Sequence, residues 1–271
     1  MIQVFSPSGI GDAYWLLMKV LPNTNKRIHL RVPPGNSEVY KRSSFLCSID
    51  RVEKVTADGL PYTALIHKAK EFSYKKIEKV MYLEANTWLE SGKHIEDYMP
   101  GFINSYRLNW LITKDEYQKA ISFFSPSKKN IVIYTSSLQN NRKVKNWNSD
   151  FWKVLISRLY KSVNLIWIGA EYDSDILEQF KGFNLNTVIN ESPGVILSLL
   201  RNCTGFISYQ SGLSCISVAE SIPTFMLYFR HIEKLSYSIC PKTSLNNSVL
   251  YYRAFFDSVY TTQIESWINS L

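Results

Sequence analysis

Short apolar segments alternate with segments of helical periodicity along most of the chain, and this alternation limits the fold more than any other feature of the sequence. It is clearest in the second half, where strands are expected at 131–134, 163–169, 187–189, 204–208 and 224–228. Helices are expected at 149–161, 173–180, 193–201, 211–221 and 263–271. Strands that are apolar throughout and separated by helices are typical of a parallel sheet covered on both faces. The sequence therefore predicts an α/β protein.

The first half shows the same alternation in a less regular form. Strands are expected at 1–6, 27–32, 52–55 and 79–83. Helical segments are expected at 13–20, at 37–47 and over most of 106–124. The best candidate for a linker is 125–130, where a proline is followed by polar residues.

The length of 271 residues suits one large or two modest domains. We expect two doubly wound Rossmann-like domains facing a cleft, one at 1–127 and one at 128–271. The last helix is expected to pack back on the first domain. In such a fold ligands bind at the carboxyl ends of the strands, so the cleft is the expected site.

Charge and composition indicate which kinds of binding partner and which cellular compartment suit this protein. The chain has 31 Lys and Arg against 23 Asp and Glu, a net charge of +8, which favours polyanionic partners. Its four cysteines are scattered without metal-ligand spacing, which argues against a zinc site or a disulfide framework and favours a reducing, cytoplasmic compartment. No window approaches 18 uninterrupted apolar residues, so no transmembrane segment is expected.

Four segments that follow predicted strands carry residues suited to chemistry at the cleft. The first is Ser8-Gly9-Ile10-Gly11-Asp12. Its two glycines allow a tight turn and a close approach of the ligand to the backbone. Asp12 is either the N-cap of the next helix or a general base at the mouth of the cleft.

The second segment is a basic loop, R-K-V-K-N-W at 142–147. Arg142 and Lys145, together with Ser136 and Ser137, would suit a diphosphate. The alternative is an ordinary solvated loop.

The third segment leads from a strand into a helix and contains Gln210, Ser211, Gly212, Leu213 and Ser214. Its backbone N–H groups and hydroxyls could hold phosphate oxygens. The alternative is ordinary capping of the helix by serine.

The fourth segment, G-A-E-Y-D at 169–173, contains Gly169, Glu171 and Asp173. A carboxylate here could accept the two hydroxyls of a ribose. The alternative is a capping box for the next helix.

Taken in order, these segments resemble motifs of the bacterial lipopolysaccharide heptosyltransferases, which are inverting glycosyltransferases of the GT-B architecture. The matching stretches are G-I-G-D at 9–12, K-N-W-N at 145–148, G-A-E-Y-D at 169–173 and Q-S-G-L-S-C at 210–215. Two residues depart from the family pattern, because Gln210 stands for an acidic residue and Cys215 for a histidine. Both belong to the environment of the donor sugar, which puts ADP-heptose itself in doubt.

The resemblance implies a role for each segment. Asp12 would be the catalytic base, directly after an acceptor-side loop formed by residues 8–11. The donor phosphates would be bound by Arg142, Lys145 and residues 211–214. The nucleoside and sugar would contact a wider set: Ser136, Ser137, Gly169, Glu171, Asp173 and Gln210. The N-terminal domain would bind the acceptor and the C-terminal domain the nucleotide sugar.

The expected activity is therefore inverting transfer of a sugar from a nucleotide-diphosphate sugar to a hydroxyl of a polyanionic acceptor. No metal and no cofactor are expected, since the lysine, the arginine and the helix start would stabilise the leaving diphosphate. The acceptor stays open between hydroxymethylated DNA bases of bacteriophage type and a lipopolysaccharide-type saccharide. The alternative function is a catalytically inactive GT-B-like module that binds a nucleotide or nucleic acid.

Overall fold

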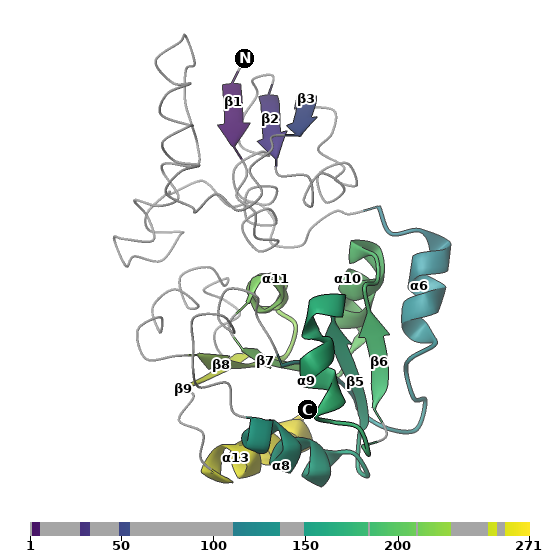
Figure 1. Ribbon diagram of the computed structural model, residues 1–271, viewed down its shortest axis with the longest axis vertical. Helices are drawn as coiled ribbons and strands as arrows, with labels where there is room; N and C mark the ends of the chain where they lie inside the picture. The colour runs from purple at the N-terminus through teal and green to yellow at the C-terminus, as the bar shows by residue number, and fades with distance from the viewer. Residues whose placement is uncertain are drawn as a thin grey trace. The chain divides into compact units, whose positions relative to one another are not determined.

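The computed structural model describes residues 2–5, 28–32, 49–54, 111–135, 149–183, 185–209, 211–228, 249–253 and 258–271 (Figure 1). The chain divides into two compact units, Met1–Leu111 with Lys234–Ile239 and Ile112–Glu233 with Cys240–Leu271. In the described ranges no helix has the length and apolar character needed to cross a membrane.

The first unit contains a three-stranded parallel sheet. Its strands are β1 (Ile2–Phe5), β2 (Ile28–Val32) and β3 (Ile49–Lys54), in the order β1-β2-β3. These are the first three strands expected from the sequence, with β3 beginning earlier than expected. The strand expected at 79–83 and the helices expected at 13–20 and 37–47 lie outside the described residues.

The second unit is built on a six-stranded sheet in the order β6-β5-β4-β7-β8-β9, and every pair of neighbours is parallel. The strands are β4 (Asn130–Tyr134), β5 (Asn164–Gly169), β6 (Asn186–Ile189), β7 (Gly205–Tyr209), β8 (Thr224–Tyr228) and β9 (Val249–Arg253). The chain fills one half of the sheet from β4 outward to β6 and then returns to the middle to place β7 beside β4. The strand order reverses between β4 and β7, which makes this sheet doubly wound.

Helices connect these strands, as the α/β prediction requires. They are α6 (Lys114–Ile121), α8 (Ser149–Leu159), a 3-10 turn η5 (Glu171–Asp173), α9 (Ser174–Glu178), α10 (Pro193–Asn202), α11 (Gly212–Ala219) and α13 (Ser258–Ser270).

Both faces of the second sheet are covered, and each face has its own apolar core. Alternate residues of β4 show the division, since Ile131 and Ile133 face α8 and α13 whereas Val132 faces α10. Trp152 of α8 and Trp167 of β5 are fully buried in the first of these cores. A sheet buried on both faces explains why its central strands are apolar throughout.

The boundary between the units falls at Leu111/Ile112 rather than near residue 127. The reason is that α6 packs on α10, with Ala120 fully buried in the core shared by the two helices. The segment expected as a linker instead joins α6 to β4 within one unit. Its ends are tied together by Asn130, which accepts from the Ser125 N–H at 2.8 Å and donates to the Ser125 carbonyl at 3.1 Å.

The last helix begins earlier than expected, at Ser258 rather than near residue 263. α13 is longer than expected and packs beside α8 on the second unit's own core, where Ile264, Trp267 and Ile268 are buried (Figure 1). Lys129 Nζ donates to the carbonyls of Ile268 (2.8 Å) and Asn269 (3.2 Å) at its C-terminal end. A cation at this end of a helix is favourable, which helps to hold α13 against the start of β4.

Candidate functional site

The carboxyl ends of the second unit's parallel strands lie along one side of the sheet, called here the carboxyl edge. The described turns that leave it follow β5, β6 and β7. In a doubly wound sheet ligands bind at this edge, beside the point where the strand order reverses. Here that point lies between Thr135, which follows β4, and Tyr209, the last residue of β7.

The helix that starts beside this point is capped by two serines. The Ser214 N–H donates to Ser211 Oγ (3.2 Å), and the Ser211 N–H donates to Ser214 Oγ (2.7 Å). The Ser214 hydroxyl also donates to the Ser211 carbonyl at 2.8 Å. The capping role considered from the sequence is therefore present. Gly212 and Leu213 occupy the first two helical positions, whose N–H groups have no partner within a helix.

The neighbouring helix start at the same edge already has an anion. Ser192 is the N-cap of α10 and donates its hydroxyl to the carboxylate of Glu116, which comes from α6. A Cβ on Gly194 would overlap that carboxylate, so Glu116 lies against the first turn of α10. The positive end of α10 is thus neutralised from within the protein.

Neither α10 nor α11 has an acidic residue in its own first turn. The difference is that α11 is capped by the neutral hydroxyls of Ser211 and Ser214, whereas the cap of α10 also contacts the carboxylate of Glu116. The partial positive charge of the helix N-terminus therefore stays available to an anion. Among the described helices that start at the carboxyl edge, α8 and α9 have an acidic residue in the first turn and α10 has Glu116, so the start of α11 suits a phosphate best.

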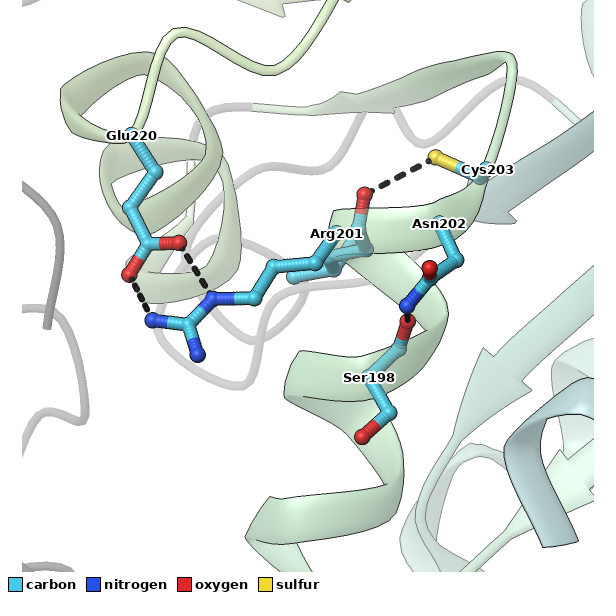
Figure 2. A network of polar contacts seen from close by, with 6 residues as sticks. Ser198, Arg201, Asn202, Cys203 and Glu220 are labelled. Carbon is cyan, nitrogen blue, oxygen red and sulfur yellow. Dashed lines mark hydrogen bonds and ion pairs between the residues drawn. The ribbon is translucent and has the colours of Figure 1, made fainter. Parts of the chain in front are cut away.

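The position of α11 is set at its other end by a buried ion pair (Figure 2). Arg201, on α10, donates from Nε and from a terminal nitrogen to the two carboxylate oxygens of Glu220, the C-cap of α11, at 2.7 and 2.8 Å. The Glu220 side chain is 1% exposed and the Arg201 side chain 12%. A bidentate pair has fixed geometry, so it holds the two helices in register.

The turn after β5 separates its two acidic candidates. Asp173 is buried and accepts from the Ala170 N–H at 2.9 Å, which makes it the cap of its own turn. Glu171 is exposed, and its backbone N–H donates to Asn190 Oδ1 at 2.8 Å. Gly169 is required by close packing, because a Cβ there would overlap the ring of Trp167. The carboxylate placed to reach a ligand is therefore that of Glu171.

A buried hydrogen bond links β5 to the residue that follows β4. Trp167 Nε1 donates to Thr135 Oγ1 at 2.9 Å, and both residues are fully buried. Thr135 directly precedes Ser136 and Ser137, which are predicted to bind the donor together with the basic loop at 142–147. Several predicted site residues lie outside the described part of the chain: Ser136, Ser137, Arg142, Lys145, Gln210, Asp12 and residues 8–11.

Asn190 is the residue of this edge that the sequence reasoning missed. It follows β6 and has a left-handed backbone, with φ of 53°. Asparagine directly after a predicted strand is the signal that would have found it, since Asn adopts this conformation more readily than most residues.

Two further results concern chemistry away from this edge. Burial raises the pKa of the Cys203 thiol to about 12, so it stays protonated at neutral pH and is no nucleophile. In the part of the chain that the structure describes, no three His, Cys, Asp or Glu side chains gather as a metal site would need. Metal independence stays a prediction.

The comparisons with known proteins concern the fold. No protein-family model matches the sequence, and no curated protein matches it either. Among solved structures, E. coli ADP-heptose lipopolysaccharide heptosyltransferase II aligns over 99% of this chain and 97% of its own, at 12% identity and a TM-score of 0.63. A family 9 glycosyl transferase from Veillonella parvula aligns over 97% of this chain and 90% of its own, at 12% identity and a TM-score of 0.64. E. coli heptosyltransferase WaaC with ADP aligns over 99% of both chains, at 13% identity and a TM-score of 0.59.

The chain has the heptosyltransferase fold. The similarity extends over nearly the whole length of this chain and of the E. coli chains, and not only over the second sheet. The predicted α/β class of Rossmann-like sheets and the predicted family resemblance are thereby confirmed at the level of the fold.

Proposed function

We propose that the chain is a glycosyltransferase that moves a sugar from a nucleoside-diphosphate sugar to an acceptor hydroxyl. The observation that carries the proposal is the neutral start of α11 beside the reversal of strand order, with the exposed Glu171 on the same edge. A chain with the heptosyltransferase fold would need those two groups there, one for the diphosphate and one for the nucleoside.

On the donor side, the N–H groups of Gly212 and Leu213 would hold phosphate oxygens, and Glu171 would accept the hydroxyls of the ribose. Arg142 and Lys145 would add positive charge to the diphosphate site. Asp173 would act indirectly, because its buried carboxylate is used to shape the turn that carries Glu171.

The proposed reaction is a single displacement with inversion. Asp12 takes the proton from the acceptor hydroxyl, and the acceptor oxygen forms a bond to the anomeric carbon. The bond from that carbon to the phosphate oxygen breaks, and its electron pair leaves with the nucleoside diphosphate. The helix N-terminus and the two cations stabilise the negative charge that develops there, so we propose that the step needs no metal ion.

The acceptor is proposed as a polyanion because the chain carries a net charge of +8. Two acceptors fit this charge, DNA with hydroxymethylated bases and an anionic saccharide of lipopolysaccharide type. The salt dependence of acceptor binding distinguishes DNA from the saccharide. The logarithm of the affinity for DNA falls with the logarithm of the salt concentration, and each DNA phosphate that the protein neutralises makes that slope steeper.

The test measures binding and transfer separately in Asp12→Asn and Lys145→Ala variants. Asp12→Asn is expected to abolish transfer and keep donor affinity, since only the base is removed. Lys145→Ala is expected to weaken nucleoside-diphosphate binding by about tenfold, the value of one charge-assisted contact. EDTA is expected to change neither result.

Three outcomes would count against the proposal. Transfer that survives in Asp12→Asn would remove Asp12 as the base, and unchanged affinity in Lys145→Ala would remove its phosphate role. Stabilisation of the wild type by plain duplex DNA, with none by any nucleotide, would favour the inactive binding module.

A further inference from the structure

We infer that Asn190 is a positioning residue that holds the backbone of Glu171 and thereby sets a preference for ribose over 2′-deoxyribose in the bound nucleotide. The inference rests on the proposed function, because it assumes that Glu171 contacts the nucleoside. The sequence motifs place the donor site only on the segments that follow β4, β5 and β7. The inference adds Asn190, which follows β6, to that site.

Asn190 contacts the turn after β5 in two places. Its backbone N–H donates to the carbonyl of Gly169 at 3.1 Å, and its side-chain Oδ1 accepts from the backbone N–H of Glu171 at 2.8 Å. The two contacts extend the β5–β6 pairing, which ends at Gly169 and Ile189, by one further step into the turn. The backbone of Glu171 is therefore held to the end of β6 by hydrogen bonds.

Asp173 holds the same turn from the other side. Its Oδ2 accepts from the Ala170 N–H at 2.9 Å, and its own N–H donates to the Ala170 carbonyl at 2.8 Å. The backbone between Gly169 and Glu171 is thus fixed by hydrogen bonds on both sides. The exposed carboxylate of Glu171 takes no part in these bonds.

This division of roles is what a preorganised contact requires. A carboxylate on a backbone that is already fixed loses less conformational freedom on binding than one on a free loop. If Glu171 bonds both ribose hydroxyls, removal of one hydroxyl costs more when the backbone that carries the carboxylate is fixed than when that backbone can move to compensate.

Asparagine also suits this position better than its nearest substitutes. The φ of 53° at Asn190 is costly for most residues other than Gly, Asn and Asp. Gly would keep the backbone but lose the acceptor for the Glu171 N–H. Asp would keep an acceptor but add a negative charge beside the Glu171 carboxylate.

The test is therefore the ratio of affinities for a ribonucleoside diphosphate and its 2′-deoxy form. The probes are ADP, GDP, UDP and CDP with their 2′-deoxy counterparts, titrated by calorimetry into the full-length protein. For whichever base binds, the wild type is expected to prefer the ribose form by about tenfold. Asn190→Gly is expected to reduce that ratio by about threefold or more, and Glu171→Gln to abolish most of it.

Asn186→Ala provides a matched control at the opposite end of the same strand. Asn186 Nδ2 donates to Asn164 Oδ1 at 2.8 Å, so this variant also removes a side-chain hydrogen bond between β6 and β5. It is expected to lower the melting temperature without changing the ribose preference. A loss of preference in Asn190→Gly is then not explained by a weakened strand.

The outcomes separate this inference from the proposed function. If no nucleotide binds, the proposed function fails and the inference fails with it. If Glu171→Gln reduces the ratio and Asn190→Gly leaves it at the wild-type value, Asn190 has no positioning role while the donor site stands. An Asn186→Ala variant that reduces the ratio as much as Asn190→Gly would also overturn the inference.

Discussion

Residues that resemble one another in the sequence take opposite roles in the structure. Glu171 and Asp173 are two positions apart and both acidic, yet Asp173 is buried as a cap and Glu171 is exposed. The sequence predicted that this turn carries an important carboxylate. It could not separate the two, because the difference depends on a 3-10 turn whose third residue points inward.

Cys203 gives a prediction at this scale that depends on pH. Its thiol has a pKa of about 12 in the fold, raised from 9.0 by burial, although part of the residue reaches the surface. The buried neutral thiol therefore stabilises the fold below pH 9, and that contribution is lost as the pH rises from 9 towards 12. The loss is at most about 1.4 kcal/mol for each pH unit in that window.

Cys203→Ser isolates this contribution, because the serine hydroxyl does not titrate there. Urea unfolding of the wild type and the variant, measured from pH 8 to pH 10, is expected to show the two free energies converging above about pH 9. A difference that stays constant across the range would show that the thiol is not held in its neutral form.

At the scale of elements, the sequence predicted best where burial on both faces makes a strand apolar throughout. β4, β5, β7 and β8 were expected within one or two residues of their observed bounds. β9 was missed, because its V-L-Y-Y-R sequence carries tyrosines and an arginine and lies at the outside of the sheet. Edge strands have one unpaired side and need not be apolar throughout.

The ion pair between α10 and α11 leads to a stability prediction. Glu220→Ala leaves Arg201 without its bidentate partner in a site where both side chains are largely buried, and is expected to cost about 3 kcal/mol. Urea denaturation measures this cost. Replacing both residues by methionine is expected to cost less, since no uncompensated charge remains.

Glu265→Ala is the control on a comparable but exposed pair. Arg158 and Glu265 are 3.4 Å apart and their side chains are 41% and 31% exposed. The expected cost is below about 1 kcal/mol. Equal costs for Glu220→Ala and Glu265→Ala would mean that the buried pair does not fix α11.

At the scale of the whole molecule, the order of four short motifs predicted the fold better than it predicted the limits of the units. The motifs follow strands along the chain, so their order carries the topology. The boundary was placed too late because it depends on α6 packing on α10. The contact of Glu116 with Ser192 and Gly194 joins positions far apart in the sequence, so it cannot be predicted from the local sequence around either position.

The topology of the second sheet is the reason why the donor site is proposed in the second unit. Its sheet reverses order between β4 and β7, and α11 starts there without an acidic residue. Glu116 already occupies the start of α10, and α8 and α9 have an acidic residue in the first turn, so among the described helix starts at this edge that of α11 suits an anion best.

The central claim is that the first N–H groups of α11 bind the diphosphate, and Gly212→Pro tests it most directly. Proline at the first helical position removes one N–H and keeps the helix, and the extended backbone of Ser211 (φ −153°, ψ 173°) is compatible with a following proline. Gly212→Ala is the control, since it adds a Cβ and keeps the N–H.

The measurement is the affinity of the wild type and of the two variants for the nucleoside diphosphate that binds the wild type. The melting temperatures of the three proteins are compared as well, so that a loss of affinity is not explained by a loss of stability. We predict that Gly212→Pro binds about tenfold more weakly or worse, while Gly212→Ala stays close to the wild type. Equal affinity in Gly212→Pro and Gly212→Ala would contradict the claim, because the diphosphate would then not depend on the start of α11.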